Sequence, residues 1–357
     1  MLSMAKADGA PKTPSRKMTD TNLLMTITIV VFFVMYLCAI FFLGEGFKKP
    51  QALFNIFSTN SYLIILACGM SLVMITGGID ISVGGVTALV AMSCAVYLEE
   101  SQGNVYIAML IAVGIGLAFG LVQGFLIAYL KIQPFIVTLA GMFFARGLTT
   151  IVHTNPLNVT SNKDFVSLKD ARITIPFLGT TNKKGNYIPA TIEIGVIVAI
   201  VIVLILFCVL KWSKLGRNFY AVGGNRQSAL MLGINVQRTT FISYVICGLL
   251  AGVGGFVYFM HVGSGSPSHA SGAEMNAIAS SIIGGTMLTG GVGNIIGTLF
   301  GVLSLALIQN IVASLGLDQP WWTGITIAAM LCIFLVVQSI IIARRKKANM
   351  KKQKGAA

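Results

Sequence analysis

Charged side chains are scarce in this sequence, and acidic ones are the scarcest. Only 10% of the 357 residues are charged and only 11 are Asp or Glu, whereas a soluble globular protein carries about 25% charged residues. Hydrophobic residues make up 55% of the chain. No water-soluble core could bury so much apolar surface, so the composition excludes a soluble globular protein and indicates one embedded in a membrane.

Histidine and cysteine are too few and too scattered to suggest a metal site or a disulfide framework. The three histidines, at 153, 261 and 269, have no acidic or thiol partner at metal-ligand spacing. Each of the six cysteines lies in an apolar run, and no C-x-x-C pair occurs. We therefore expect no metal, histidines in packing or loop roles, and cysteines that act as small core residues.

The dipeptide Gly-Lys does not occur anywhere in the chain. The phosphate-binding loop G-x-x-x-x-G-K-[ST] is therefore absent, and we expect no ATP to bind through such a loop. No cluster of nucleophile, base and orienting residue emerges either, which makes a membrane enzyme a disfavoured alternative.

Long runs without charge are what the sequence has in abundance. Most reach the ~20 apolar residues that a helix needs to cross a hydrocarbon core of ~30 Å. They predict an all-α, polytopic transmembrane bundle of about ten spans, with eight as the alternative. Two spans are short enough to be broken or re-entrant helices, namely 81–98 and 275–289. The ten predicted spans are 23–43, 51–76, 81–98, 104–130, 134–152, 190–210, 239–261, 275–289, 291–315 and 320–343.

The net charge of +14 lies in tails and loops, which favours a membrane orientation over nucleic-acid binding. Most of the 25 Lys and Arg become cytoplasmic when both termini are placed inside, because they lie in the two tails, at Lys131 and in 211–238. No cleavage pattern precedes the first span, so 23–43 is expected to be an anchor. The prediction is a cytoplasmic tail at 1–22, a transmembrane domain at 23–343 with an extracytoplasmic loop at 153–189, and a basic cytoplasmic tail at 344–357.

Glycine is frequent, with 39 residues, and often paired inside apolar runs. Small residues let membrane helices approach closely, and paired glycines beside short helices are where the backbone can unwind around a transport pathway. Tight packing alone is the alternative for any one pair. The pairs at 77–78 and 84–85 are echoed by those at 284–285 and 290–291, which is a weak sign of duplicated halves.

Residues 211–238 form the predicted cytoplasmic segment between two spans. The stretch that follows Asn225 can make a short amphipathic helix, with Asn225 as N-cap and Gly233 as terminator. Ala229, Leu230 and Leu232 would be its apolar contacts. Such a helix suits the groove of a partner protein, and an ordinary loop with one helical turn is the alternative.

This segment resembles the coupling loop of ABC-importer permeases. Their Glu-Ala-Ala-x-x-x-Gly pattern is matched in degenerate form by Gln227-Ser228-Ala229 and Gly233. The resemblance extends over almost the whole chain to the monosaccharide permeases of the ribose, galactose and galactofuranose type. It departs from that family at Gln227, which replaces the coupling Glu, and in the basic loop 153–189. The stretches that carry it are Gly77-Gly-Ile-Asp-Ile-Ser-Val-Gly84, 134–147, Leu215-Gly-Arg-Asn, Ala221-Val-Gly-Gly-Asn225 and 274–301.

Four shorter stretches look closest to the galactofuranose permease. They are 139–147, Ala277-Ile-Ala-Ser, Gly297-Thr-Leu-Phe-Gly301 and the pair Trp321-Trp322.

The resemblance implies a permease subunit in the bacterial cytoplasmic membrane, which forms the translocation pathway for a monosaccharide. A separate ATP-binding cassette ATPase would bind the ATP, so the chain itself would hold no cofactor. An extracytoplasmic sugar-binding protein would deliver the substrate, and a second copy or a paralogous permease would complete the pore. Coupling to the ATPase is assigned by the resemblance to Gly216, Arg217, Asn218, Gly223, Gly224, Asn225, Gln227, Ser228, Ala229 and Gly233.

Charged groups inside a membrane are costly and usually mark pathways or ion pairs. Asp80, Arg146 and Glu274 are such groups, and Asp80 also lies where it can cap the helix that begins near Ser82. A neutral sugar calls for hydrogen bonds and stacking. The candidate pathway residues, each of which packing alone would also explain, are Gly77, Gly78, Asp80, Ser82, Gln123, Phe143, Phe144, Arg146, Glu274, Gln309 and Asn310.

An ion-coupled secondary sugar transporter is the alternative function. It would need carboxylates within the membrane, and Asp80 and Glu274 are the two that the sequence offers.

Overall fold

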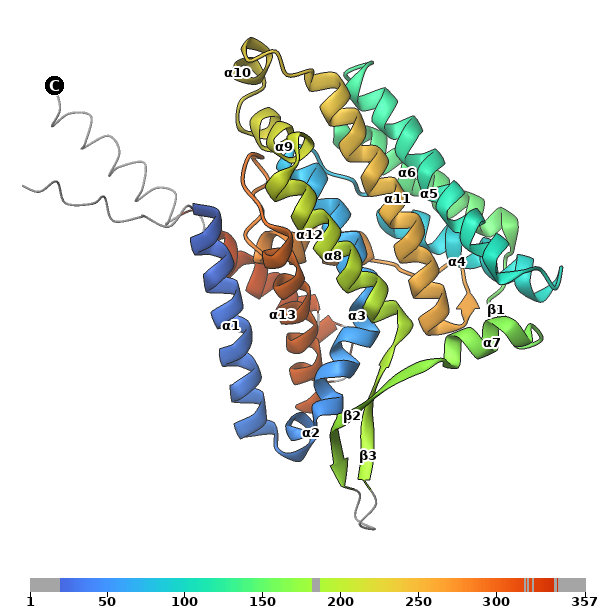
Figure 1. The fold of residues 1–357 in the computed structure, drawn as a ribbon. Helices are drawn as coiled ribbons and strands as arrows, with labels where there is room; N and C mark the ends of the chain where they lie inside the picture. Colours follow the sequence, from blue (N-terminus) through green and yellow to red (C-terminus); the bar gives the residue numbers. More distant parts are fainter. Residues whose placement is uncertain are drawn as a thin grey trace, which may run out of the picture.

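The computed structural model describes residues 20–181, 187–317, 319, 321–322, 324–336 and 339. Most of the predicted N-terminal tail, all of the basic C-terminal tail and the end of the last predicted span lie outside these residues. The described chain is a bundle of helices (Figure 1), in which α3 (Pro50–Ile75) is the most deeply buried long helix. This architecture agrees with a polytopic membrane protein.

Among the described residues, seven helices are long and apolar enough to cross a membrane. They are α1 (Asp20–Leu43), α3, α5 (Val105–Ala128), α6 (Pro134–Val152), α8 (Ile194–Trp212), α11 (Val236–Val262) and α13 (Ile295–Ser314). A shorter apolar helix covers Gly324–Val336. The remaining helices are α2 (Glu45–Lys48), α4 (Val83–Glu99), α7 (Lys163–Asp170), α9 (Lys214–Gly224), α10 (Arg226–Met231) and α12 (Ala273–Ile283).

Two of the predicted crossings are short helices, as their lengths suggested. α4 has 17 residues, and α12 has 11 and ends at Ile283. The span predicted at 275–289 is helical only as far as Ile283, in line with the expectation that it could be a broken helix. Gly285 and Gly290 have φ angles of 90° and 83°, which break the helical backbone, and the chain turns until α13 begins.

The all-α prediction is wrong at the short strands found in 157–193 and at 264–265. There β1 (Leu157–Asn158) pairs antiparallel with β4 (Ser264–Gly265), and β2 (Arg172–Thr181) pairs antiparallel with β3 (Tyr187–Glu193). The span predicted from residue 190 begins instead at Ile194. The preceding stretch is rich in β-branched Ile and Thr, which pack well on a pleated surface and favour the strand.

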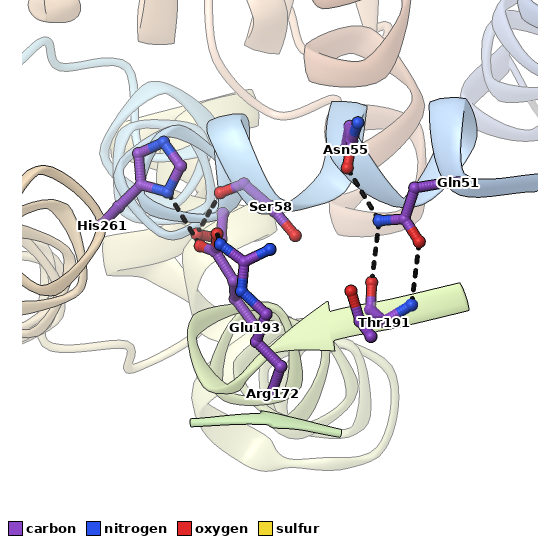
Figure 2. Close-up of polar contacts among 8 residues, drawn as sticks. Gln51, Asn55, Ser58, Arg172, Thr191, Glu193 and His261 are labelled. Atoms are coloured by element: carbon purple, nitrogen blue, oxygen red, sulfur yellow. Dashed lines mark hydrogen bonds and ion pairs between the residues drawn. The ribbon is translucent and has the colours of Figure 1, made fainter. Parts of the chain in front are cut away.

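The base of this hairpin is fixed to the helices (Figure 2). The side-chain oxygen of Gln51 in α3 accepts from the Thr191 N–H at 2.8 Å, and its Nε2 donates to the Thr191 carbonyl at 3.1 Å. Glu193 lies 2.8 Å from Nδ1 of His261 at the end of α11, and 3.6 Å from the Arg172 guanidinium. The hairpin therefore projects from a fixed position at the end of the bundle opposite to α9 and α10 (Figure 1).

The cysteines do not all behave as core residues. Cys68, Cys94 and Cys247 are buried, whereas Cys38, Cys208 and Cys332 lie exposed on the outer surfaces of helices. The prediction of small core residues is therefore right for the first three and wrong for the others, whose apolar surroundings in the sequence are equally typical of a lipid-facing helix surface.

Candidate coupling surface and transport pathway

The segment between α8 and α11 doubles back on itself at one end of the bundle. Ser213 accepts a hydrogen bond from the Gly216 N–H at 3.0 Å, and a β-carbon on Gly216 would overlap the backbone of Leu210. Phe219 and Val222 of α9 are buried, while Arg217 is exposed and Asn218 is half-buried. The chain therefore reverses its direction around Ser213 and Gly216, and α9 packs against the bundle through Phe219 and Val222.

The short helix expected after Asn225 is confirmed as α10. The Asn225 side chain accepts from the Ser228 N–H at 2.9 Å. Gly233, with a φ of 76°, donates its N–H to the Leu230 carbonyl at 2.9 Å and so ends the helix. Both roles follow the sequence prediction, because the cap and the stop are local features of the chain.

Apolar side chains of α10 divide between an inner and an outer face. Ala229 is buried, whereas Leu230, Met231 and Leu232 are 61%, 80% and 77% exposed. Gln227 and Ser228 are exposed as well. Ala229 therefore fixes α10 to its own chain, and the three residues that follow it are available to a partner. No acidic residue occurs in 211–238, whereas five basic residues do, so this surface is positive.

The end of α9 rests on two glycine turns. A β-carbon on Gly223 would overlap the Ile75 carbonyl oxygen and lie 2.6 Å from the Gly291 nitrogen. The Gly291 N–H donates to the same carbonyl at 2.9 Å. A β-carbon on Gly290 would lie 2.9 Å from the Gly223 oxygen and 3.0 Å from the Gly77 Cα. We name Gly77, Gly223, Gly290 and Gly291 the glycine junction, because β-carbons on Gly223, Gly290 and Gly291 would enter the space of the neighbouring backbones.

Two tyrosines connect the neighbouring segments to each other. The Tyr220 hydroxyl of α9 donates to the Gly293 carbonyl at 2.8 Å. Burial raises the pKa of Tyr220 to about 12, so the hydroxyl keeps its proton and remains a donor. The Tyr244 hydroxyl of α11 donates to the Ile79 carbonyl at 3.2 Å, and a β-carbon on Gly78 would overlap it. Neither tyrosine was singled out from the sequence, because no local pattern reveals these distant carbonyl partners.

Three of the candidate pathway residues meet at the start of α4. The carboxylate of Asp80, only 2% exposed, accepts from the Ser82 N–H at 3.0 Å and from its hydroxyl at 2.7 Å. The same hydroxyl lies 3.2 Å from the side-chain oxygen of Gln123. Because Ser82 donates its one hydroxyl proton to Asp80, it has none for Gln123. Among the described residues, the Gln123 Nε2 also has no partner.

Arg146 and Glu274 hold the region around the start of α12. The Arg146 guanidinium donates to the carbonyl oxygens of Pro267 and Ala270, both at 3.1 Å, and to that of His269. It therefore fastens α6 to the loop before α12. Glu274, 8% exposed, lies against Gly84, where a β-carbon would overlap its Oε2. This oxygen has no hydrogen-bond partner in the described part of the chain.

The remaining candidates lie elsewhere. Phe143 and Phe144 are 65% and 62% exposed on α6. Phe144 borders an apolar cavity of about 310 Å³ between α5 and α6, which Gln123 also lines. Gln309 and Asn310 on α13 line a separate cavity with α2 and α3. The eleven candidates therefore do not form one site.

A bundle of long apolar helices with two shorter buried helices, α4 and α12, beside glycine-containing turns is typical of multi-pass membrane transport proteins. Over residues 52–335, the sequence matches the family described as the branched-chain amino acid transport system / permease component. The chain belongs to this family. It is a permease component of the membrane-embedded type and not an enzyme.

Several curated relatives are similar along most of their length. The fructose import permease protein FruG of Bifidobacterium longum (strain NCC 2705) is 34% identical over 326 residues, which cover 91% of this chain and 93% of the relative. The inner membrane ABC transporter permease protein YjfF of Escherichia coli (strain K12) is 36% identical, covering 90% and 93%. The ribose import permease protein RbsC of the same strain is 35% identical, covering 82% and 88%. No solved structure gives a significant match.

Proposed function

We propose that this chain is the permease subunit of an ABC importer for a monosaccharide. Its relatives are named as import permeases for fructose, ribose and galactose, and the stretches at 139–147 and 277–280 favour a sugar of the galactofuranose type within this class. A partner ATPase binds the ATP, and an extracytoplasmic binding protein delivers the sugar. A second permease copy, or a paralogous permease, completes the pathway.

The glycine junction is the observation that carries this proposal. The segment α10 and the residue after it expose Leu230, Met231 and Leu232 for the groove of the ATPase. The helix α9, which contains Gly223, directly precedes α10 in the chain. At Gly223 the backbone touches Ile75, where α3 ends, and Gly291 in the turn between α12 and α13. A displacement of α10 is thereby transmitted to the segments that begin α4 and end α12. Both short helices, α4 and α12, are connected to the same junction.

Besides Gly223, eight of the ten coupling residues have a role in this route. Gly216 permits the reversal into α9, and Arg217 contributes to the positive surface around it. Asn218 is a half-buried residue of α9, between Arg217 and the buried Phe219. Asn225 and Gly233 set the ends of α10, Gln227 and Ser228 form its exposed first turn, and Ala229 holds it against the chain.

The end of the bundle with α9 and α10 is the cytoplasmic one in this proposal. The positive-inside rule supports this, because 17 of the 25 Lys and Arg lie in the two tails, at Lys131 and in 211–238, which this orientation places inside. α1 begins at the α9–α10 end (Figure 1), which agrees with an internal N-terminus. With α4, α12 and 324–336 as three shorter passes, the chain makes ten passes and returns inside.

The sugar pathway passes the first turn of α4. Gln123 and Glu274 flank this turn with one unpartnered polar atom each in the described chain. A sugar hydroxyl can donate to the Glu274 carboxylate and accept from the Gln123 amide, which would satisfy both atoms. Asp80 and Ser82 hold the turn, and Arg146 holds the loop that follows α11.

Reconstitution tests the proposal directly. In proteoliposomes that contain this chain, its ATPase and its binding protein, we expect ATP-dependent uptake of a monosaccharide. The variant Ala229→Glu places a charge at a buried position and should abolish both uptake and co-purification of the ATPase. Uptake driven by a proton or sodium gradient without ATP would contradict the proposal in favour of ion coupling.

A second measurement tests the orientation alone. In a variant without the native cysteines, a cysteine introduced at Arg226 should be protected from an impermeant maleimide in intact cells and become reactive after permeabilisation. Labelling of intact cells would place α10 outside and contradict the proposed route.

A further inference from the structure

The structure contains a polar cavity, which neither the coupling route nor the start of α4 explains. It lies between α2, α3 and α13, at the end of the bundle opposite to α10, and has a volume of about 310 Å³. Small-molecule sites in proteins have volumes of about 300–1,000 Å³, so the cavity is large enough for one small ligand.

The lining of this cavity is polar but uncharged. Asn55, Thr59 and Asn60 face it from α3, together with Gln309 and Asn310 from α13. Every described residue that lines it is neutral. Side-chain amides and a hydroxyl that faced lipid would lack hydrogen-bond partners, which costs free energy in the hydrocarbon region. The polar lining therefore indicates a cavity that holds water or a polar ligand.

The hydrogen-bonding capacity of the lining suits a ligand rich in hydroxyl groups. The side-chain amides of Asn60 and Asn310 donate to the carbonyls of Ile56 and Ala306, both at 2.9 Å. Their side-chain oxygens form no hydrogen bond within the described chain and remain free to accept. Phe47, also in the lining, adds an aromatic ring. Hydroxyl groups donate to such oxygens, and the C–H face of a sugar ring packs against an aromatic surface.

We infer that this cavity is an outward-facing binding site for a neutral monosaccharide. The inference rests on the proposed function and adds a location where the sugar sits before it reaches α4. Thr59 lies nine residues after Pro50, or roughly 14 Å along α3 at 1.5 Å per residue. The site is therefore within the outer part of the membrane. An amino acid, which the family description would suggest, carries two charges for which the described lining offers no ionic partner.

The cavity is also connected to the hairpin. Gln51 bonds the backbone of Thr191 in β3 and donates to Asn55 in the lining at 2.8 Å (Figure 2). Because one side chain joins the base of the hairpin to the cavity, a protein that displaces the hairpin from outside would also displace Asn55.

Saturation-transfer NMR on the purified full-length chain in detergent micelles tests this site. The probes, each measured separately, are ribose, fructose, galactose and leucine, which represents the zwitterionic amino acids. We expect saturation transfer to at least one sugar and none to leucine. Thr59→Val, which removes a hydroxyl without changing the shape, and Asn310→Leu should each weaken sugar binding about fivefold, as the loss of one hydrogen bond does.

Thr150→Val is the matched control, because Thr150 is an exposed threonine near the corresponding end of α6 and outside this cavity. No signal from any sugar, a signal from leucine instead, or an equal loss in the control would overturn the inference. Uptake in proteoliposomes that contain the permease, its ATPase and its binding protein distinguishes a failure of the proposed function from a failure of the cavity inference. If wild type shows no ATP-dependent uptake, the proposed function fails. If wild type imports sugar and both cavity variants match it in half-saturation and rate, the cavity inference alone fails.

Discussion

Replacement of Gly223 by alanine is the sharpest test of the coupling route. The new β-carbon would lie 2.6 Å from the Gly291 nitrogen and overlap the Ile75 carbonyl oxygen. An ordinary contact begins near 3.4 Å, so the Gly291 backbone must move by roughly 0.8 Å. Neither obstacle is a flexible side chain that can turn away. Overpacking of this kind costs about 1–3 kcal/mol.

We expect this cost to appear in transport. The strain separates α9 from Ile75 and Gly291, so ATP-dependent uptake by Gly223→Ala should fall about fivefold or more, since 1.4 kcal/mol corresponds to one factor of ten in an equilibrium. The ATPase should still bind, because α10 keeps its cap, its stop and its exposed residues. The assay therefore measures uptake, ATPase co-purification and the amount of permease in the membrane on the same preparations.

Gly224→Ala provides the matched control. It adds the same methyl group one residue later, where no described atom lies within 4 Å of the new β-carbon. It should import sugar at nearly the wild-type rate. Equal uptake by the two variants, whether both high or both low, would refute the argument that close backbone contact at Gly223 transmits the movement.

Three further predictions address other contacts. Asn225→Ala removes the N-cap of α10 and should destabilise that helix by about 1 kcal/mol; co-purification of the ATPase should weaken, and Asn225→Ser should restore it. Arg146→Ala removes three hydrogen bonds to the loop before α12 and should lower the melting temperature of the purified permease, and Arg146→Lys should not restore it because an ammonium lacks the planar fork. Hydrogen bonds from Ser161 and Thr160 lower the pKa of the Glu99 carboxyl in the folded protein. The ionised carboxylate therefore stabilises the fold above the ordinary pKa of about 4.3, and this stabilisation is lost as the pH falls through the lowered pKa. The melting temperatures of wild type and Glu99→Gln, measured from pH 7 to pH 3, should therefore differ at neutral pH and converge in acid.

Features that depend on neighbouring residues were predictable from the sequence. α10 is the clearest case, because an asparagine cap and a glycine stop act within a few residues of the helix they bound. The long apolar helices follow from composition in the same way. The hairpin was missed because runs of Ile and Thr with few charges satisfy a hydropathy criterion as well as a strand criterion, and only pairing with β2 decides between them.

Contacts between distant segments were not predictable to the same degree. The glycine pairs at 77–78, 223–224 and 290–291 each stood out in the sequence, yet nothing local shows that they meet. Gln309 and Asn310 were chosen as polar residues in an apolar helix, but their grouping with Asn55 and Thr59 depends on how α13 packs on α3. Arg146 was a candidate for the pathway because it is charged, but no local pattern in the sequence reveals its carbonyl partners at 267–270.

α3 connects the two ends of the proposed mechanism. It has 26 residues, or about 39 Å at 1.5 Å per residue, and is continuous from Pro50 to Ile75. Asn55 and Thr59 lie near its outer end in the cavity, and the Ile75 carbonyl lies in the glycine junction at its inner end. A buried helix moves largely as one body, because close packing prevents local adjustment. A shift of Ile75 driven through α10 should therefore displace the cavity, and an occupied cavity should resist that shift. In proteoliposomes this predicts that Thr59→Val alters the stimulation of the ATPase by sugar-loaded binding protein, although Thr59 lies far from α10, and that Thr150→Val does not.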